Sequence, residues 1–269
     1  MTPRLARHDL TVEKRLWEKN IFFGKISAQL NKMCLIKLLR WKMHKIKIQL
    51  LICLSILMPL CAFSATNDLF TIDKPVVPTS YPTDQRLYDM YRNSAMVYYG
   101  VTENNSLLQV LSFHTLNRWP EQIQSFELAH TLDQENFLRR FVSPVVGVVQ
   151  VAGNITHRNG KDENQIYEFD PYVIFRWANL PWNNYVNTSF ALGEGVSYAS
   201  SVPSIEKEGS DNTKRFLNYL MFEATFAMPS YPRLQVLARV HHRSGAYGLY
   251  RAGNSGSNDV GLGIRYLFD

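Results

Sequence analysis

The run Arg239–Gly245 brings together residue types that hydrolyse esters. His242 and Ser244 stand two positions apart, and in an extended chain residues i and i+2 point to the same face. A neutral imidazole beside a serine hydroxyl accepts its proton as the serine oxygen attacks a carbonyl carbon. The run therefore predicts a serine esterase site in which Ser244 is the nucleophile and His242 is the general base.

A site of this kind needs a third group that orients the imidazole. If the final strand of the chain pairs with the strand that carries His242, Asn258 is the polar residue on the same face. Asp259 is chemically the stronger orienting group, but it points to the opposite face unless a bulge shifts the register. Gly245 and Gly248 follow the serine, and their backbone N–H groups are candidate donors to an oxyanion.

Other chemistries have little support. The three cysteines, Cys34, Cys53 and Cys61, all lie in the first 65 residues, so the rest of the chain offers no thiolate ligand. His241 and His242 face opposite ways, which argues against a two-histidine metal site. The chain has no H-E-x-x-H sequence, phosphate-binding loop or dinucleotide fingerprint. No metal and no cofactor are expected.

Alternation of period two predicts the strands that must position these residues. Its clearest instance is 165–179, where an apolar parity of Tyr167, Phe169, Val173, Phe175 and Trp177 opposes Glu168, Asp170 and Arg176. The predicted strands are 95–113, 122–132, 138–155, 165–179, 185–200, 214–228, 233–244 and 258–268. Short connections near 133–137, 180–184 and 229–232 alternate with longer ones near 114–121, 156–164, 201–213 and 245–257.

Three residues depart from the alternating pattern of these strands. Pro144 and Pro171 lie inside predicted strands, where proline cannot donate to a ladder, so a bulge or bend is expected at each. Glu194 lies between two glycines and shares the parity of Phe190 and Val196. It is interpreted as an acid at a strand end rather than as a residue near lipid head groups.

The pattern predicts an all-β fold, an eight-stranded antiparallel transmembrane β-barrel of the outer-membrane type. Opposite charges on the polar parity, such as Glu223 and Arg239, can pair inside a narrow eight-stranded lumen. Bulky aromatic residues on the other parity suit a lipid-facing wall, and Tyr266-Leu267-Phe268 is an ending typical of such barrels. A soluble lipocalin-like barrel or a β-sandwich remains the alternative.

The front of the chain differs in charge from the rest. Residues 1–65 hold 12 of the 29 Lys and Arg residues and 3 of the 23 acidic residues, which leaves 17 basic and 20 acidic residues for the other 204. The formal net charge of +6 therefore belongs to the front segment, and the main domain has no basic footprint for nucleic acid.

The order of residues in this front segment is that of a secretory signal. Lys45 and Lys47 precede an apolar run over 48–63, and Ser64 and Ala65 follow it. We interpret 43–65 as the signal peptide, 1–42 as a mispredicted extension, 66–93 as a periplasmic lead-in with a short helix near 85–92, and 94–269 as the barrel. An uncleaved inner-membrane anchor is the alternative for the apolar run.

The segment from His242-Arg243-Ser244 through Asn258 to Phe268 resembles the PagL-type lipid A 3-O-deacylases. The resemblance implies an outer-membrane barrel with a Ser/His/Glu site on its outer wall, which hydrolyses an ester-linked acyl chain of lipopolysaccharide without a metal. His242 matches the base of that family and Ser244 matches its nucleophile.

Two departures indicate a divergent branch of that family. The family's orienting Glu falls on Asn258 or the neighbouring Asp259, and the residue after the serine, often an Asn credited with oxyanion stabilisation, is Gly245. An Asn fixes an imidazole tautomer but does not stabilise imidazolium as a carboxylate does, so slower turnover is expected.

The predicted function is a serine esterase of the bacterial outer membrane that acts on lipid A or a related acylated lipid. Lipopolysaccharide of the outer leaflet is its expected partner, nucleic acid is not, and a homodimer is left open. One alternative is a non-enzymatic barrel of the same fold with a structural or lipid-binding role. The other is a soluble periplasmic barrel that binds a small apolar ligand.

Overall fold

The computed structural model describes residues 81–159, 165–253 and 255–269, all of which belong to the compact unit Pro59–Asp269. The predicted extension over 1–42 and signal peptide over 43–65 lie outside the described residues, as does 66–80 of the lead-in. Among the described residues, no helix has the length and apolar character needed to cross a membrane.

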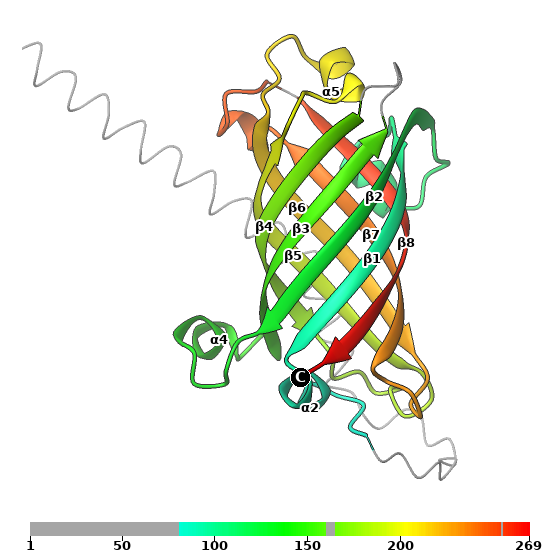
Figure 1. Ribbon diagram of the computed structural model, residues 1–269, viewed down its shortest axis with the longest axis vertical. Helices are drawn as coiled ribbons and strands as arrows, with labels where there is room; N and C mark the ends of the chain where they lie inside the picture. The colour runs from blue at the N-terminus through cyan, green and yellow to red at the C-terminus, as the bar shows by residue number, and fades with distance from the viewer. Residues whose placement is uncertain (1–80, 160–164, 254) are drawn as a thin grey trace, which may run out of the picture. The chain divides into compact units, whose positions relative to one another are not determined.

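Eight antiparallel strands close into a barrel in which consecutive strands pair and β1 pairs with β8 (Figure 1). The strands are β1 (Asn93–Glu103), β2 (Arg118–Thr131), β3 (Val148–Asn159), β4 (Gln165–Trp177), β5 (Asn187–Ala199), β6 (Phe216–Ala227), β7 (Leu234–Ser244) and β8 (Gly256–Phe268). This confirms the predicted fold, and the predicted bounds of β4 to β8 are within two residues of those observed.

Two predicted strands are too long because each contains a short capped helix. The segment 95–113 ends in α3 (Leu107–Leu111), which begins with a capping box between Ser106 and Gln109. The segment 138–155 begins in α4 (Phe137–Val142), which Asn136 caps through the backbone N–H of Leu138. The β2–β3 connection is therefore 132–147, far longer than the turn predicted at 133–137.

The bulge or bend expected at each proline does not appear as a change of register. Pro144 lies after α4, outside any strand. Pro171 does lie in β4, where the β4–β5 ladder is interrupted between the pairs Phe169↔Tyr198 and Tyr172↔Gly195, but the register is the same on both sides. The missing proline donor therefore costs the barrel a short interruption of pairing and no shift of side-chain facing.

The side chains are distributed as in a membrane-spanning barrel. Large apolar residues on the outer parity are about half exposed, as with Phe169 (53%) and Ile264 (51%), whereas Arg176 and Arg265 are fully buried in the lumen. A soluble barrel needs the opposite arrangement, with its apolar residues inside. The lipocalin-like and β-sandwich alternatives are therefore wrong.

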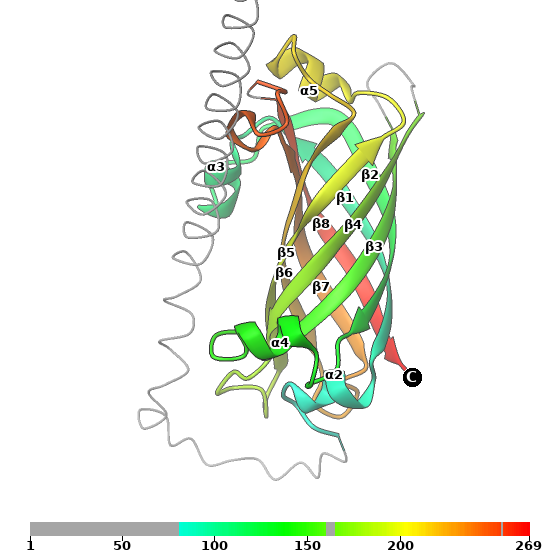
Figure 2. The same cartoon turned by 90° about the vertical axis from the view of Figure 1, so that its left-hand side faces the viewer.

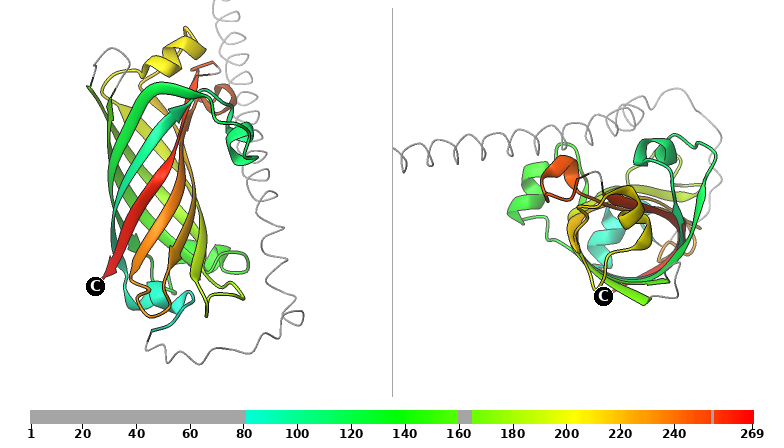
Figure 3. Two further views of the ribbon diagram at one scale, coloured as in Figure 1. Left: turned by 90° about the vertical axis from the view of Figure 1, so that its right-hand side faces the viewer. Right: turned by 90° about the horizontal axis from the view of Figure 1, so that it is seen from above.

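Short helices lie at both ends of the barrel (Figures 1, 2). At the end that carries the C-terminus, α2 (Arg86–Met90) lies within the ring of strands in the view along the barrel (Figure 3). Tyr88 of α2 bonds Ser189 and Gln235 at 3.2 Å, so this helix, predicted near 85–92, closes the lumen.

At the opposite end, α5 (Ser204–Gly209) and η1 (Ala246–Gly248) lie in the β5–β6 and β7–β8 connections (Figure 2). Glu206 of α5 reaches into the lumen, where its Oε1 lies 3.1 Å from Arg243 Nε and accepts a hydrogen bond from the Ser257 hydroxyl. Burial raises the pKa of Glu206, although the adjacent Arg243 guanidinium opposes the shift. Helix α5 therefore covers this end of the lumen.

Candidate active site on the outer wall

His242 and Ser244 lie at the end of β7 that is near α5, and both face outward. They share the parity of Val236, which is 53% exposed, while the intervening Arg243 is fully buried in the lumen. In the ladder, His242 is opposite Asn258 of β8, and Ser244 is opposite Gly256. The outward placement that the alternation predicts is therefore observed.

Asn258 orients the imidazole of His242. His242 Nδ1 lies 2.7 Å from Asn258 Oδ1, and Asn258 Nδ2 donates to the carbonyl oxygen of Asn105 at 2.7 Å. Because the Asn258 amide uses its N–H for Asn105, it offers His242 an acceptor, and Nδ1 must carry the proton. In the neutral ring Nε2 is then unprotonated, which is the tautomer that a general base requires.

Asp259, the other candidate for the orienting role, is not part of this site. Its side chain is fully buried in the lumen, where Arg158 donates to it at 2.7 Å and Thr102 also donates to it. The bulge that would turn it outward is absent, since β7 and β8 keep one register from Leu234 to Ser244.

Ser244 is close to His242 but is not bonded to it. Alternate residues of a strand are about 7 Å apart along the backbone, a separation that imidazole and hydroxyl side chains span by rotation about χ1. In the described parts of the chain, no hydrogen bond joins the Ser244 hydroxyl to His242. The two side chains therefore share one face of β7 and need a rotation to make contact.

The glycines after the serine do not supply a ready oxyanion hole. The N–H of Gly245 donates to the carbonyl oxygen of Ser255 at 2.9 Å, and that of Gly248 donates to Gly245 at 3.0 Å. The expectation that these two groups are free donors is therefore wrong, because they close the β7–β8 connection on itself.

A carboxylate that the sequence did not single out, Glu103, lies beside this site. Glu103 is opposite Asn258 in the β1–β8 ladder and shares the outward parity of Val97 and Tyr99. It is 1% exposed, and neither carboxylate oxygen has a hydrogen-bond partner. Its outward parity could have been read from the sequence, but its position next to Asn258 depends on closure of the barrel.

Glu194 and Asn218 lie on the other side of the site. Asn218 of β6 is opposite Ser244, and its side chain contacts that of Glu194 on β5. Glu194 is the eighth of the 13 residues of β5 and not the end of a strand, so its interpretation as a strand-end acid is wrong. The outer wall therefore carries a row of polar side chains around Ser244.

Two connections present apolar side chains next to this row. Figures 2 and 3 show α3 and the β7–β8 connection outside the barrel wall at the α5 end. Leu108 and Phe113 at α3 and Tyr247 in the β7–β8 connection are more than 70% exposed, and Phe113 and Tyr247 both have positive φ. The site therefore has an apolar border.

A histidine and two carboxylates that are close enough to hold a metal lie elsewhere, in the lumen: Glu168, Asp170 and His241. They come from β4 and β7, and His241 points inward while its neighbour His242 points outward. No metal site is expected from the sequence. Alternation shows that these three residues face the lumen, but it does not identify which strands face each other across it.

No family model matches the chain, and no curated protein matches it. Among solved structures, the outer membrane enzyme PagL is similar at 14% identity and a TM-score of 0.41, over 65% of this chain and 98% of PagL. Neisserial surface protein A is similar at 9% identity and a TM-score of 0.36, over 66% of this chain and 96% of that protein. The outer membrane protein OprG from Pseudomonas aeruginosa is similar at 10% identity and a TM-score of 0.29, over 66% and 97%. These similarities concern the barrel fold, so any function must be judged from the site itself.

Proposed function

We propose that this protein is a serine esterase of the bacterial outer membrane that removes an ester-linked acyl chain from lipid A or a related acylated lipid. The observation that carries the proposal is the His242–Asn258 hydrogen bond on the outer wall, with Ser244 two residues further along the same face. A site on the wall of a membrane barrel meets lipid directly, so a lipid is the substrate that can reach it.

The reaction follows from the orientation of the imidazole. The Ser244 oxygen attacks the ester carbonyl while His242 Nε2 accepts its proton, and Asn258 Oδ1 holds the Nδ1–H of the imidazolium. Nε2 then returns the proton to the departing alkoxide. Water hydrolyses the resulting acyl-serine, with His242 again acting as the base.

The lipid assignment is supported by the surroundings of the site. Polar side chains surround Ser244, the wall toward the C-terminal end of the barrel carries large exposed apolar residues such as Leu128 and Ile264, and the flanking connections expose Leu108, Phe113 and Tyr247. An acylated sugar lipid has the matching form, since its head group lies at the membrane surface and its chains lie along the wall. The ester at their junction would then lie near Ser244.

Glu103 supplies the negative charge that the Asn258 amide lacks. A carboxylate opposite Asn258 stabilises an imidazolium at His242 through space, because charge interactions are strong where water is excluded. We assign Glu103 as a positioning residue and not as a catalytic one, since Asn258 lies between it and the imidazole.

The test is mass spectrometry of lipid A from cells that express the wild type, Ser244→Ala or His242→Ala. Loss of one acyl chain is expected with the wild type only. Ser257→Ala is the matched control, because Ser257 lies near Ser244 in the β7–β8 ladder but is buried and bonded to Glu206 in the lumen. An unchanged acyl pattern with the wild type, or full activity in Ser244→Ala, contradicts the proposal.

A non-enzymatic lipid-binding barrel is the second candidate. It is favoured by the amide at the orienting position and by the lack of a Ser244–His242 hydrogen bond in the described part of the chain. It predicts that the wild type binds lipid A vesicles without changing them, and that Ser244→Ala binds equally well.

A further inference from the structure

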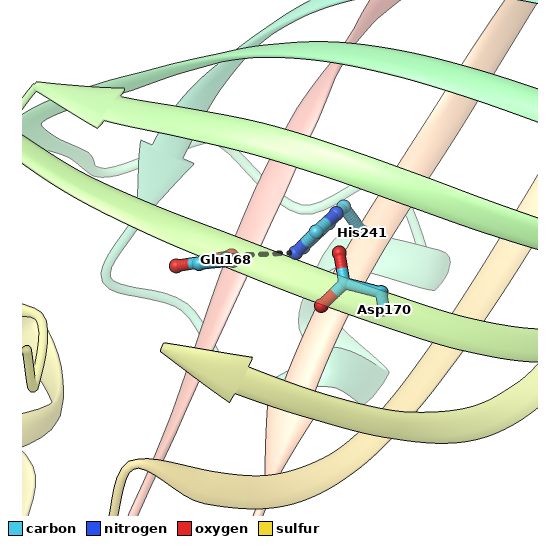
Figure 4. A group of neighbouring side chains, drawn as sticks. All are labelled: Glu168, Asp170 and His241. Atoms are coloured by element: carbon cyan, nitrogen blue, oxygen red, sulfur yellow. Dashed lines mark ion pairs between the residues drawn. The ribbon is translucent and has the colours of Figure 1, made fainter. Parts of the chain in front are cut away.

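Glu168, Asp170 and His241 converge inside the lumen near the α5 end (Figure 4). Glu168 and Asp170 alternate on β4, so both point inward, and His241 reaches them from β7. One potential ligand atom from each residue lies within 4.8 Å of the other two. All three side chains are at most 1% exposed.

In each carboxylate one oxygen accepts a hydrogen bond of good geometry. The other oxygen of Glu168 contacts His241, and the Ser197 hydroxyl lies close to the Asp170 carboxylate. Glu168 Oε1 accepts from Arg158 Nε at 2.8 Å and lies 3.3 Å from Arg243, while Asp170 Oδ2 accepts from Asn154 at 3.1 Å. Glu168 Oε2 and Asp170 Oδ1 have no partner with hydrogen-bond geometry. Neighbours that fix one oxygen and orient the other are typical of carboxylates that bind metals.

The imidazole of His241 also lacks hydrogen bonds. Neither ring nitrogen makes a hydrogen bond, although Nε2 lies 3.2 Å from Glu168 Oε2. The ring is fixed by an edge contact with Tyr219, whose centroid is 4.8 Å away and whose own hydroxyl has no partner. Buried polar atoms without partners are rare in folded proteins, and several that face one another indicate a missing ligand.

The excess of negative charge in this region also favours a bound cation. The upper cluster consists of five buried carboxylates and two buried guanidiniums that are linked through these contacts. Its members are Glu121, Glu168, Asp170, Glu206, Asp259, Arg158 and Arg243. The five carboxylates outnumber the two guanidiniums, and uncompensated buried charge is costly.

We propose that the lumen binds one divalent transition-metal cation of the Zn²⁺ class, through a ring nitrogen of His241, Glu168 Oε2 and Asp170 Oδ1. One imidazole and two carboxylates form a ligand set that suits Zn²⁺. Zinc ligands lie about 3.4 Å from one another, given metal–ligand distances of 2.0–2.2 Å, so small rotations of the three side chains complete the site. The proposal does not depend on the esterase activity.

The bound cation stabilises the barrel by joining two strands that are not neighbours, β4 and β7. Because His241 and His242 are adjacent, it also fixes the β7 backbone at the position that carries the outer-wall imidazole. The alternative is that His241 and Glu168 satisfy one another as an ion pair, which leaves no need for a metal.

The experiment is calorimetric titration of Zn²⁺ into the untagged full chain, purified from membranes in detergent and treated with EDTA. One Zn²⁺ per barrel is expected, with Ca²⁺ binding at least about tenfold more weakly because imidazole favours transition metals. A wild type that binds no stoichiometric Zn²⁺, or that binds Ca²⁺ more tightly, overturns the proposal without any variant.

His241→Gln and His242→Gln form a matched pair, since the two residues are adjacent and face opposite sides of the wall. His241→Gln is expected to weaken Zn²⁺ binding by more than about tenfold, because loss of an outer-shell partner alone costs that much. His242→Gln is expected to bind as the wild type does, and circular dichroism verifies folding of both. Loss of binding in His242→Gln with retention in His241→Gln overturns the site.

Discussion

The lumen contains two charged clusters that differ in balance. The central cluster is Glu127 and Glu223 with Arg176, Arg239 and Arg265, whereas the upper cluster defined above has five carboxylates and two guanidiniums. In the central cluster each carboxylate contacts at least two guanidiniums. Two carboxylate oxygens of the upper cluster, Glu168 Oε2 and Asp170 Oδ1, face the imidazole of His241 without hydrogen bonds.

The two clusters therefore have different roles. The central cluster supports the fold, whereas the upper cluster has the features of a ligand-binding site. The central cluster joins β2, β4, β6, β7 and β8 across the lumen, and each of its carboxylates is paired with guanidiniums of the chain. The upper cluster lies beneath α5 and beside the outer-wall site, and its surplus is negative. A folded chain keeps unpaired buried charge where a ligand or a function compensates for it.

The largest effect is expected from Glu223→Gln. This carboxylate contacts Arg176, Arg239 and Arg265, so its loss leaves buried guanidiniums without compensation and lowers the free energy of unfolding by about 3–5 kcal/mol. Urea unfolding in lipid vesicles, with samples in EDTA, measures it. A loss below about 1 kcal/mol would remove the distinction between the two clusters.

Zinc should act on the upper cluster only. At a free concentration of about 100 times its Kd, a ligand that binds the folded state alone raises the free energy of unfolding by about 2.7 kcal/mol. We expect this increment in the wild type and in Glu223→Gln, and not in Asp170→Asn, measured by unfolding with Zn²⁺ and with EDTA. An equal increment in Asp170→Asn would show that zinc acts elsewhere.

Glu103 extends the comparison to the outer wall, where it too is a buried carboxylate without a hydrogen-bond partner, opposite Arg118 in the β1–β2 ladder. Glu103→Gln is expected to lower kcat for ester hydrolysis about tenfold with little change in KM, because the charge matters only once the imidazolium forms. Glu103→Asp should recover part of the rate. A change confined to KM would assign Glu103 to lipid binding instead.

The smallest effect is expected from Asp170→Asn in EDTA. Removing one charge from a cluster with surplus carboxylates relieves repulsion and keeps the bond to Asn154 available, so stability should stay within about 1 kcal/mol of the wild type or rise. The same unfolding assay measures it. A loss as large as that of Glu223→Gln would mean that Asp170 is already compensated.

Signals that are local in the sequence predict the facing of side chains well and the short helices poorly. The residues of the capping box, Ser106 and Gln109, are present in the sequence. The apolar run around α3 nevertheless fits a strand as well as a helix, because short apolar runs do not distinguish the two. The outward facing of Asn258 and the inward facing of Asp259 follow from parity, since no bulge intervenes in the β7–β8 ladder.

The sequence alone determined which side chains face the lumen and which face outward, and so placed His242, Ser244 and Asn258 on one surface. It could do so because the period of two is a property of each strand by itself. Only the tertiary structure decided that Glu103 lies next to Asn258 and that Glu168, Asp170 and His241 meet. These contacts depend on the closing β1–β8 pair and on the strands that face each other across the lumen, which strand number and stagger set for the barrel as a whole.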